Sequence, residues 1–140
     1  MRRTRMNMIV CGGMLLAILV ACSFSTANLS SLKLGKDKAV SSESSSFAPA
    51  DTVYAVATVA NAPGAVKVKG VLAFEDVAGE QAGPIPGLEK TLDLPGAGTA
   101  TYTFTPPTSG WPKGKYRIEV TLLDDSGAQK DQKTASFTVS

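Results

Sequence analysis

Few residues in this chain of 140 are able to do covalent chemistry. The chain has two cysteines, Cys11 and Cys22, and no histidine. Without an imidazole it lacks the usual general base, the commonest metal ligand and the group that activates a catalytic serine. Ser30-Ser31-Leu32-Lys33 matches the Ser-x-x-Lys spacing of acyl-enzyme hydrolases, but the partner motifs are absent. This inventory predicts a protein without enzymatic activity. The thiol of Cys22 is then the reactive group whose role the surrounding sequence must indicate.

Cys22 directly follows an apolar stretch that runs from Met8 to Ala21. The residues before that stretch are basic: Arg2, Arg3 and Arg5. A basic start, an apolar middle and small residues at the end are the three parts of an export signal. The stretch is shorter than the roughly 20 residues that a membrane-spanning helix needs. We therefore expect residues 1–21 to be a signal peptide helix that is removed, together with Cys11.

The four residues Leu19-Val20-Ala21-Cys22 resemble the lipobox of bacterial lipoproteins at every position. The resemblance implies a thioether-linked diacylglycerol on Cys22, usually with an amide-linked acyl chain such as palmitate. Two or more acyl chains anchor a protein stably, so the membrane is the first expected partner. Two alternatives stay open: an ordinary secretory signal cut near Ala21 or Ala27, and an uncleaved anchor. Ser23 is not the Asp that retains many lipoproteins at the inner membrane, which favours the outer membrane in a two-membrane cell.

Removal of the signal peptide changes the charge of the chain. The full sequence has a formal net charge of +2, but three of its basic residues lie in the signal peptide and all its acidic residues follow Cys22. The mature chain is therefore nearly neutral and offers no basic surface for nucleic acid. Because Cys22 is consumed by lipid, no disulfide is expected either.

Residues 22–46 are rich in serine and end in the low-complexity run Ser41-Ser42-Glu43-Ser44-Ser45-Ser46. Their apolar residues show no regular period. Such a composition buries too little surface to offset the entropy of ordering. We predict a flexible tether with a reach of roughly 25–30 Å.

Residues 47–140 alternate apolar and polar side chains with a period of two, in short runs separated by Gly, Pro, Asn and Asp. The predicted strands cover 51–60, 65–74, 88–94, 99–105, 115–123 and 133–139, with a possible seventh near 47–50. No window of ten or more residues has a helical period. This pattern predicts an all-β domain, an antiparallel sandwich of two sheets with about six or seven strands.

The last third of the chain carries a family resemblance. Trp111-Pro112, then Gly114-Lys115-Tyr116 entering a strand, and the terminal Phe137-Thr138-Val139 resemble the closing hairpin of bacterial immunoglobulin-like extracytoplasmic modules. The resemblance implies an immunoglobulin-like sandwich without the Cys…Trp…Cys pattern of antibody domains. It implies a fold and no particular activity.

The longest predicted connection, residues 75–87, is the candidate interaction surface. Its candidate residues are Glu75, Asp76, Glu80, Pro84, Ile85 and Pro86, and Trp111 is a further candidate as an exposed aromatic anchor. In the alternative interpretation the loop only wraps one end of the sandwich. Trp111 then plugs that end, and the Tyr116 hydroxyl binds backbone. The acidic residues of this loop, or Asp124-Asp125, could also ligate calcium, although neither has the spacing of a known calcium loop.

The sequence as a whole predicts a membrane-anchored binding module with a protein or glycan partner, no cofactor and no metal. We expect the domain to be monomeric. Two other functions stay open: a structural or accessory lipoprotein of an envelope or secretion assembly, and a protease inhibitor that inserts the segment from Gly79 to Gly87.

Overall fold

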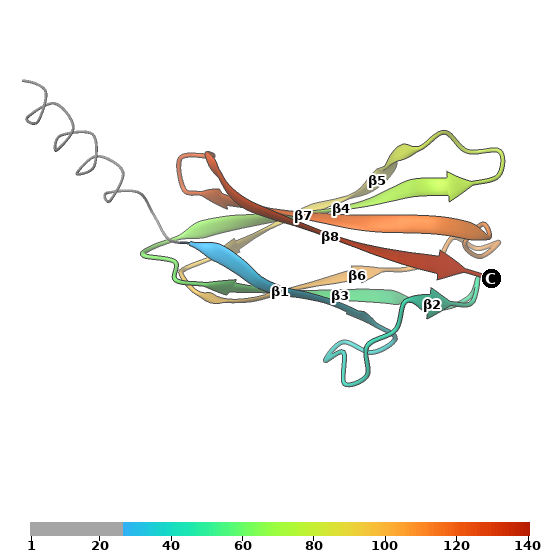
Figure 1. The fold of residues 1–140 in the computed structure, drawn as a ribbon, viewed down its shortest axis with the longest axis horizontal. Helices are drawn as coiled ribbons and strands as arrows, with labels where there is room; N and C mark the ends of the chain where they lie inside the picture. The colour runs from blue at the N-terminus through green and yellow to red at the C-terminus, as the bar shows by residue number, and fades with distance from the viewer. Residues whose placement is uncertain (1–26) are drawn as a thin grey trace, which may run out of the picture.

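A computed structural model describes residues 27–140, so the signal peptide and Cys22 lie outside the described residues. The described chain is all-β, and the predicted two-sheet sandwich is confirmed (Figure 1). Its strands are β1 (Asn28–Gly35), β2 (Ser46–Phe47), β3 (Val53–Ala60), β4 (Val66–Val77), β5 (Gly83–Leu94), β6 (Gly98–Phe104), β7 (Gly114–Asp124) and β8 (Gln129–Val139). No helix within residues 27–140 is long and apolar enough to cross a membrane.

The two sheets have the strand orders β1-β3-β6 and β2-β8-β7-β4-β5. All pairs are antiparallel except β2 with β8, which is parallel. The first, third and sixth strands therefore face a sheet built on the last two strands and β4. This is the Greek-key order of immunoglobulin-like sandwiches.

Strict alternation in β3 and β6 places one face of the smaller sheet in the core. Val53, Ala55, Ala57 and Val59 are buried, while the residues between them are half-exposed. In β6, Ala100, Tyr102 and Phe104 are buried and the threonines between them are exposed. The opposing core side chains come largely from β4, β7 and β8: Val68, Leu72, Tyr116, Ile118, Val120, Leu122, Phe137 and Val139.

Gly70 in β4 makes room for the ring of Tyr102 from the opposite sheet. A Cβ at position 70 would lie 2.6 Å from Cε1 of Tyr102, closer than real contacts allow. The Tyr102 hydroxyl donates to the carbonyl of Val68 at 2.6 Å, so its buried polar end is satisfied. Burial also raises the pKa of Tyr102 above its ordinary value.

Tyr116, near the start of β7, organises the other end of the core. Its hydroxyl donates to the carbonyl of Pro112 at 2.5 Å, four residues upstream. This is the tyrosine corner of immunoglobulin-like folds, and it confirms the prediction that the hydroxyl binds backbone. The ring stacks on Phe137, with ring centroids 5.2 Å apart. Burial, with a smaller effect from Glu80, raises the pKa of Tyr116 to about 12.

The prediction of a flexible tether over residues 22–46 is wrong for its described part. Residues 28–35 form β1, which pairs along its whole length with β3. Leu29 and Leu34 are 2% and 5% exposed and belong to the core. A bulge at Ser30 shifts the register between Leu29 and Ser31, so Leu29 and Leu34 face the core although an odd number of positions separates them. The bulge hides the period of two, and the folded unit begins well before residue 47.

The prediction of a long loop over residues 75–87 is also wrong. β4 continues to Val77 and β5 begins at Gly83, so only residues 78–82 connect them. Proline in β5 made the segment look like a loop. β5, however, is an edge strand that pairs only with β4, and an edge strand tolerates proline because its outward N–H groups have no strand to pair with.

Candidate functional site

The predicted site residues are spread over a strand pair and its turn and do not form a loop. Glu75 and Asp76 lie in β4, and Glu80 lies in the short turn. The Ser136 hydroxyl donates to Glu75 at 3.3 Å, and the Glu80 N–H donates to the Val77 carbonyl at 3.0 Å. Asp76 and Glu80 are exposed. The turn thus presents two carboxylates to solvent at one end of the sandwich.

A large bulge in β5 explains the residues Pro84, Ile85 and Pro86. Val71 pairs with Glu89 and Ala73 pairs with Pro84, so four residues of β5, 85–88, lie opposite the single residue Leu72 of β4. Gly87 has a φ of 80°, a left-handed conformation that glycine adopts readily. Ile85 and Leu88 are half-buried and pack against the core, while Pro84 and Pro86 are exposed. The bulge therefore covers the side of the sandwich where β5 and β6 face each other without pairing.

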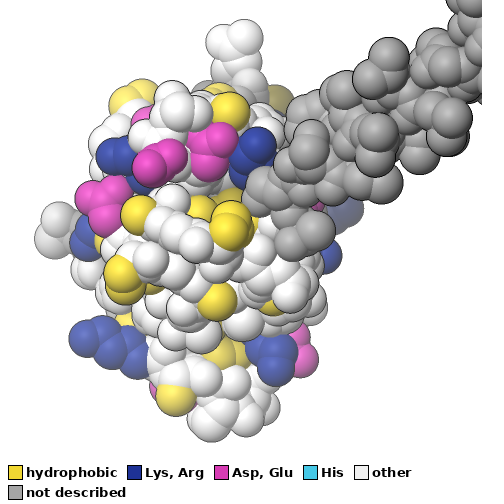
Figure 2. Space-filling model, turned by 90° about the vertical axis from the view of Figure 1, so that its left-hand side faces the viewer, with side chains coloured by type: hydrophobic (Ala, Val, Ile, Leu, Met, Phe, Trp, Pro, Cys, Tyr) yellow, Lys and Arg dark blue, Asp and Glu magenta, His cyan; other side chains and the backbone are white. Residues whose placement is uncertain are grey.

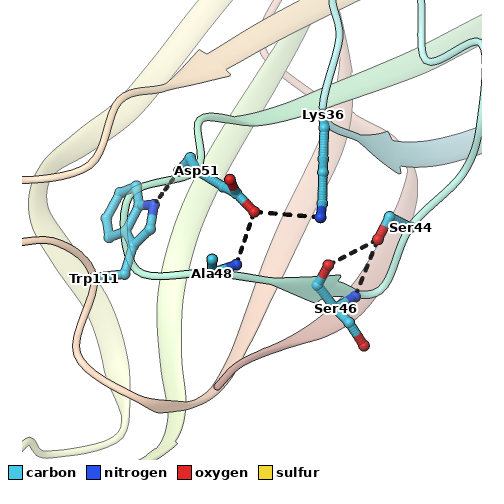
Figure 3. A network of polar contacts seen from close by, with 6 residues as sticks. All are labelled: Lys36, Ser44, Ser46, Ala48, Asp51 and Trp111. Carbon is cyan, nitrogen blue, oxygen red and sulfur yellow. Dashed lines mark hydrogen bonds and ion pairs between the residues drawn. The ribbon is translucent and has the colours of Figure 1, made fainter.

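Trp111 is not an exposed anchor, since only 4% of its surface is accessible. Its indole N–H donates to the carbonyl of Asp51 at 2.8 Å, and its backbone N–H donates to Pro49 at 2.8 Å. The Asp51 carboxylate in turn accepts the Ala48 N–H at 2.8 Å and pairs with Lys36 at 3.4 Å (Figure 3). The bond from Ala48 and the Lys36 charge hold the pKa of Asp51 below its ordinary value, against a smaller effect of burial. Trp111 is a plug, as the alternative interpretation predicted.

The acidic residues considered for calcium do not come together. Phe74 pairs with Tyr116 near one end of β4, whereas Val66 pairs with Asp124 at the other. Asp124 is engaged within its own turn, where its carboxylate accepts bonds from Ser126 and from the Ala128 N–H. These bonds, together with Lys130, lower the pKa of Asp124 to about 2. Within residues 27–140 no three His, Cys, Asp or Glu side chains are grouped so that they could hold a metal ion.

The interior of the described part is apolar. Across the described part of the chain no polar or charged residue is buried, and no buried side-chain nitrogen or oxygen lacks a hydrogen-bond partner. A site for a small polar ligand needs a few convergent polar groups. Function must therefore be sought on the surface, among sheet edges and exposed ends.

The strand edges differ sharply in how they are protected. β1 is covered by β8, because the Leu29 N–H donates to the Asp131 carboxylate at 2.8 Å. β2 has only two residues. β5 carries two prolines, a bulge and the charged residues Glu89, Lys90 and Asp93. Each of these devices hinders pairing with another strand.

β6 carries none of these devices in its own sequence, and only the β5 bulge lies beside it. It pairs only with β3, and its sequence Gly-Thr-Ala-Thr-Tyr-Thr-Phe contains neither a charge nor a proline. Its outer face is formed by the exposed Thr99, Thr101 and Thr103. A hollow of about 150 Å³ lies beside this edge, lined by Thr103, Phe104 and residues 87–90 of β5. The sequence predicts this strand but not its position at the edge of the sheet, because the order of strands in a sheet leaves no local sequence pattern.

Comparison with known proteins finds no matching family and only distant structural likenesses. No family model matches the chain, and no curated protein matches it either. Among solved structures, a Niemann-Pick type C2 protein from the Japanese carpenter ant is 12% identical over 85% of this chain and 96% of its own, with a TM-score of 0.49. The PmoD soluble domain from Methylocystis is 16% identical over 78% and 89%, with a TM-score of 0.41.

A third similar structure is a larger protein. A β-galactosidase described as putative, from Bacteroides fragilis, is 15% identical over 79% of this chain, with a TM-score of 0.47. This chain spans only 17% of that protein. With TM-scores below 0.5, none of these three likenesses assigns a fold or a function to this chain.

Proposed function

We propose that this protein is a lipid-anchored, non-enzymatic binding module of the bacterial envelope, which captures an extended segment of a partner protein on the open edge of β6. The observation that carries the proposal is the outer edge of β6, which pairs with no other described strand. A row of backbone N–H and C=O groups without a partner strand is a template for adding a strand. Peptide-binding modules of several kinds use this mode, in which backbone bonds give affinity and side-chain pockets give specificity.

The surroundings of β6 suit such a partner. An added strand would extend the three-stranded sheet, and its side chains would alternate between the threonine face and the core side. The hollow beside Thr103 and Phe104 is of side-chain size and is lined on one wall by Leu88. We expect it to accept an apolar side chain of the partner strand.

A protein partner fits better than a glycan. Sugar-binding surfaces commonly use an exposed aromatic ring, but every aromatic residue between 27 and 140 is buried or half-buried. They are Phe47, Tyr54, Phe74, Tyr102, Phe104, Trp111, Tyr116 and Phe137. The inhibitor hypothesis loses the long loop on which it rested, because Gly83 to Gly87 lie in β5. An accessory role in an envelope assembly would use the same edge with a permanent partner.

The anchor rests on the sequence. The lipobox resemblance at Leu19-Val20-Ala21-Cys22 supports acylation of Cys22, and Ser23 supports delivery to the outer membrane of a two-membrane cell. Such an anchor would hold the module outside the cytoplasm, where an exposed segment of an envelope protein can reach the β6 edge.

The test compares two lysine substitutions on the same outer face of the smaller sheet. Thr101→Lys places a charge on the edge strand β6, and Thr58→Lys places one on the central strand β3. Each tagged full-length variant is extracted from native membranes, and the co-purifying proteins are quantified against the unsubstituted chain. We expect Thr101→Lys to lower recovery of a specific partner by tenfold or more, because edge charges oppose strand addition.

The control separates the edge from the face. Thr58→Lys should leave recovery within about twofold, and similar melting temperatures should establish that both variants are folded. Unchanged recovery with Thr101→Lys would exclude the β6 edge. Equal loss with both variants would instead assign binding to the outer face of the sheet.

A further inference from the structure

Three turns and the first described residue lie together at one end of the sandwich. The turns join β3 to β4, β5 to β6 and β7 to β8, and Ala27 lies beside them, immediately before β1 (Figure 1). The β4–β5 turn belongs to the opposite end, because β4 runs twelve residues from Val66 to Val77. At about 3.3 Å a residue, this separates the ends by roughly 36 Å.

The connection from the predicted lipid attachment site to this end is short. Cys22 is five residues before Ala27. Five residues span at most about 18 Å even when fully extended. Ala27 is 7% exposed and is part of the core, so it is fixed to the sandwich and adds no length to this connection. A lipid on Cys22 would therefore hold this end within that distance of the bilayer surface.

The chemistry of the end suits a lipid headgroup surface. Pro63, Ala65, Pro95 and Ala97 are exposed in its turns, and a hollow of about 310 Å³ lies between Ala27, Pro63 and Asp124. Its charges are largely paired, Lys67 with Asp93 and Lys130 with Asp124, each at 3.4 Å. Figure 2 shows hydrophobic side chains across the middle of this end, with acidic and basic ones around them. This end therefore presents no cluster of charges of one sign that a bilayer surface would repel.

We propose that the end formed by residues 61–65, 94–98 and 124–128 is the membrane-facing surface of the protein and contacts phospholipid headgroups. The inference rests on the lipid anchor of the proposed function. The short connection, and not an affinity of the turns for lipid, keeps this end at the bilayer. The β4–β5 turn and the C-terminus then point away from the membrane, and β6, which runs between the two ends, stays open to a partner from the side.

The test places an environment-sensitive fluorophore on single cysteines of the full-length lipidated protein. Ala65→Cys and Ala97→Cys label the proposed surface, and Ala82→Cys, next to β5 at the opposite end, is the matched control. All three alanines are exposed. Each protein is reconstituted in vesicles of phosphatidylethanolamine and phosphatidylglycerol that carry a headgroup spin label. We expect at least threefold stronger quenching at positions 65 and 97 than at position 82.

Two further measurements make each outcome decisive. Metabolic labelling with palmitate is done first: a chain that takes up no lipid overturns the anchor and the orientation that rests on it. A lipidated chain with equal quenching at all three positions overturns the orientation alone. Insertion of twenty Gly and Ser residues after Ser23 should reduce quenching at position 65 to the level at position 82. Persistent quenching would show that the connection is not what holds this end.

Discussion

At the scale of single residues, the polar atoms near the core hold the backbone in place. Three aromatic side chains reach the core with one polar atom each, and each atom donates to a backbone carbonyl: Tyr102 to Val68, Tyr116 to Pro112 and Trp111 to Asp51. The displaced pKa of Asp124 has an equally local cause, the hydrogen bonds of its own turn. Perturbed pKa values often mark catalytic groups, but these have structural causes.

Tyr116 allows a direct test of this view. Tyr116→Phe keeps the ring but removes the hydrogen bond to Pro112. We expect it to lower the free energy of unfolding at pH 7 by about 1–2 kcal/mol, because the carbonyl loses its donor. Tyr54→Phe is the control, since Tyr54 is half-exposed in β3, and it should cost under about 0.5 kcal/mol. Urea unfolding measures both, and equal costs would contradict a special role for the Tyr116 hydroxyl.

The same pair predicts a pH dependence. The pKa of Tyr116 is raised to about 12 in the folded protein, above an unfolded value of 10. A raised pKa contributes stability that is fully present below pH 10 and is lost as the pH rises through 12. Phenylalanine does not titrate, so the gap between the unsubstituted protein and Tyr116→Phe should narrow from pH 10 to pH 12. A constant gap over that window would mean that the hydroxyl ionises as freely in the folded state as in the unfolded one.

At the scale of elements, the sequence predicted those strands whose alternation is uninterrupted. The sequence pattern predicts β3, β6 and β7 clearly, because every second residue of these strands faces the core. β1 and the first part of β5 have no such pattern, because bulges at Ser30 and near Ile85 break their period, whereas residues 88–94 of β5 are predicted correctly as a strand. For the same reason the pattern predicts a loop over residues 75–87, although most of that segment lies in β4 and β5. The open edge of β6 depends on strand order, which no local pattern encodes.

Because β1 belongs to the sandwich, the folded domain includes residues before 47. Residues 27–140 should unfold cooperatively, whereas residues 47–140 should not fold as a monomer. The shorter chain lacks Leu29 and Leu34, each worth about 1.5–3 kcal/mol of burial, and it leaves β3 without a neighbour on one side. Such losses are a large fraction of a typical stability of 5–15 kcal/mol. Thermal unfolding followed by circular dichroism compares the two, and equal melting temperatures would show β1 to be dispensable.

At the scale of the whole molecule, the sandwich has two distinct regions. One end gathers three turns and the first described residue, Ala27, while along one side of the sandwich the outer edge of β6 pairs with no other strand. The proposed anchor beside that end and the proposed binding edge along the side would therefore not compete for surface. The near-neutral charge of residues 22–140 fits this division, because neither proposed role depends on long-range attraction.

Loss of the proposed anchor should leave the fold intact, because Cys22 precedes the core residue Ala27 by five positions. We expect Cys22→Ala to abolish palmitate labelling, since no thioether can form, and to leave the melting temperature of the extracted sandwich within about 2 °C. Cys11→Ala is the matched control, because Cys11 lies in the predicted signal peptide, and it should label normally. A Cys22→Ala chain that still labels and sediments with membranes would contradict lipidation at this residue. Membrane attachment and partner capture would then require separate explanations.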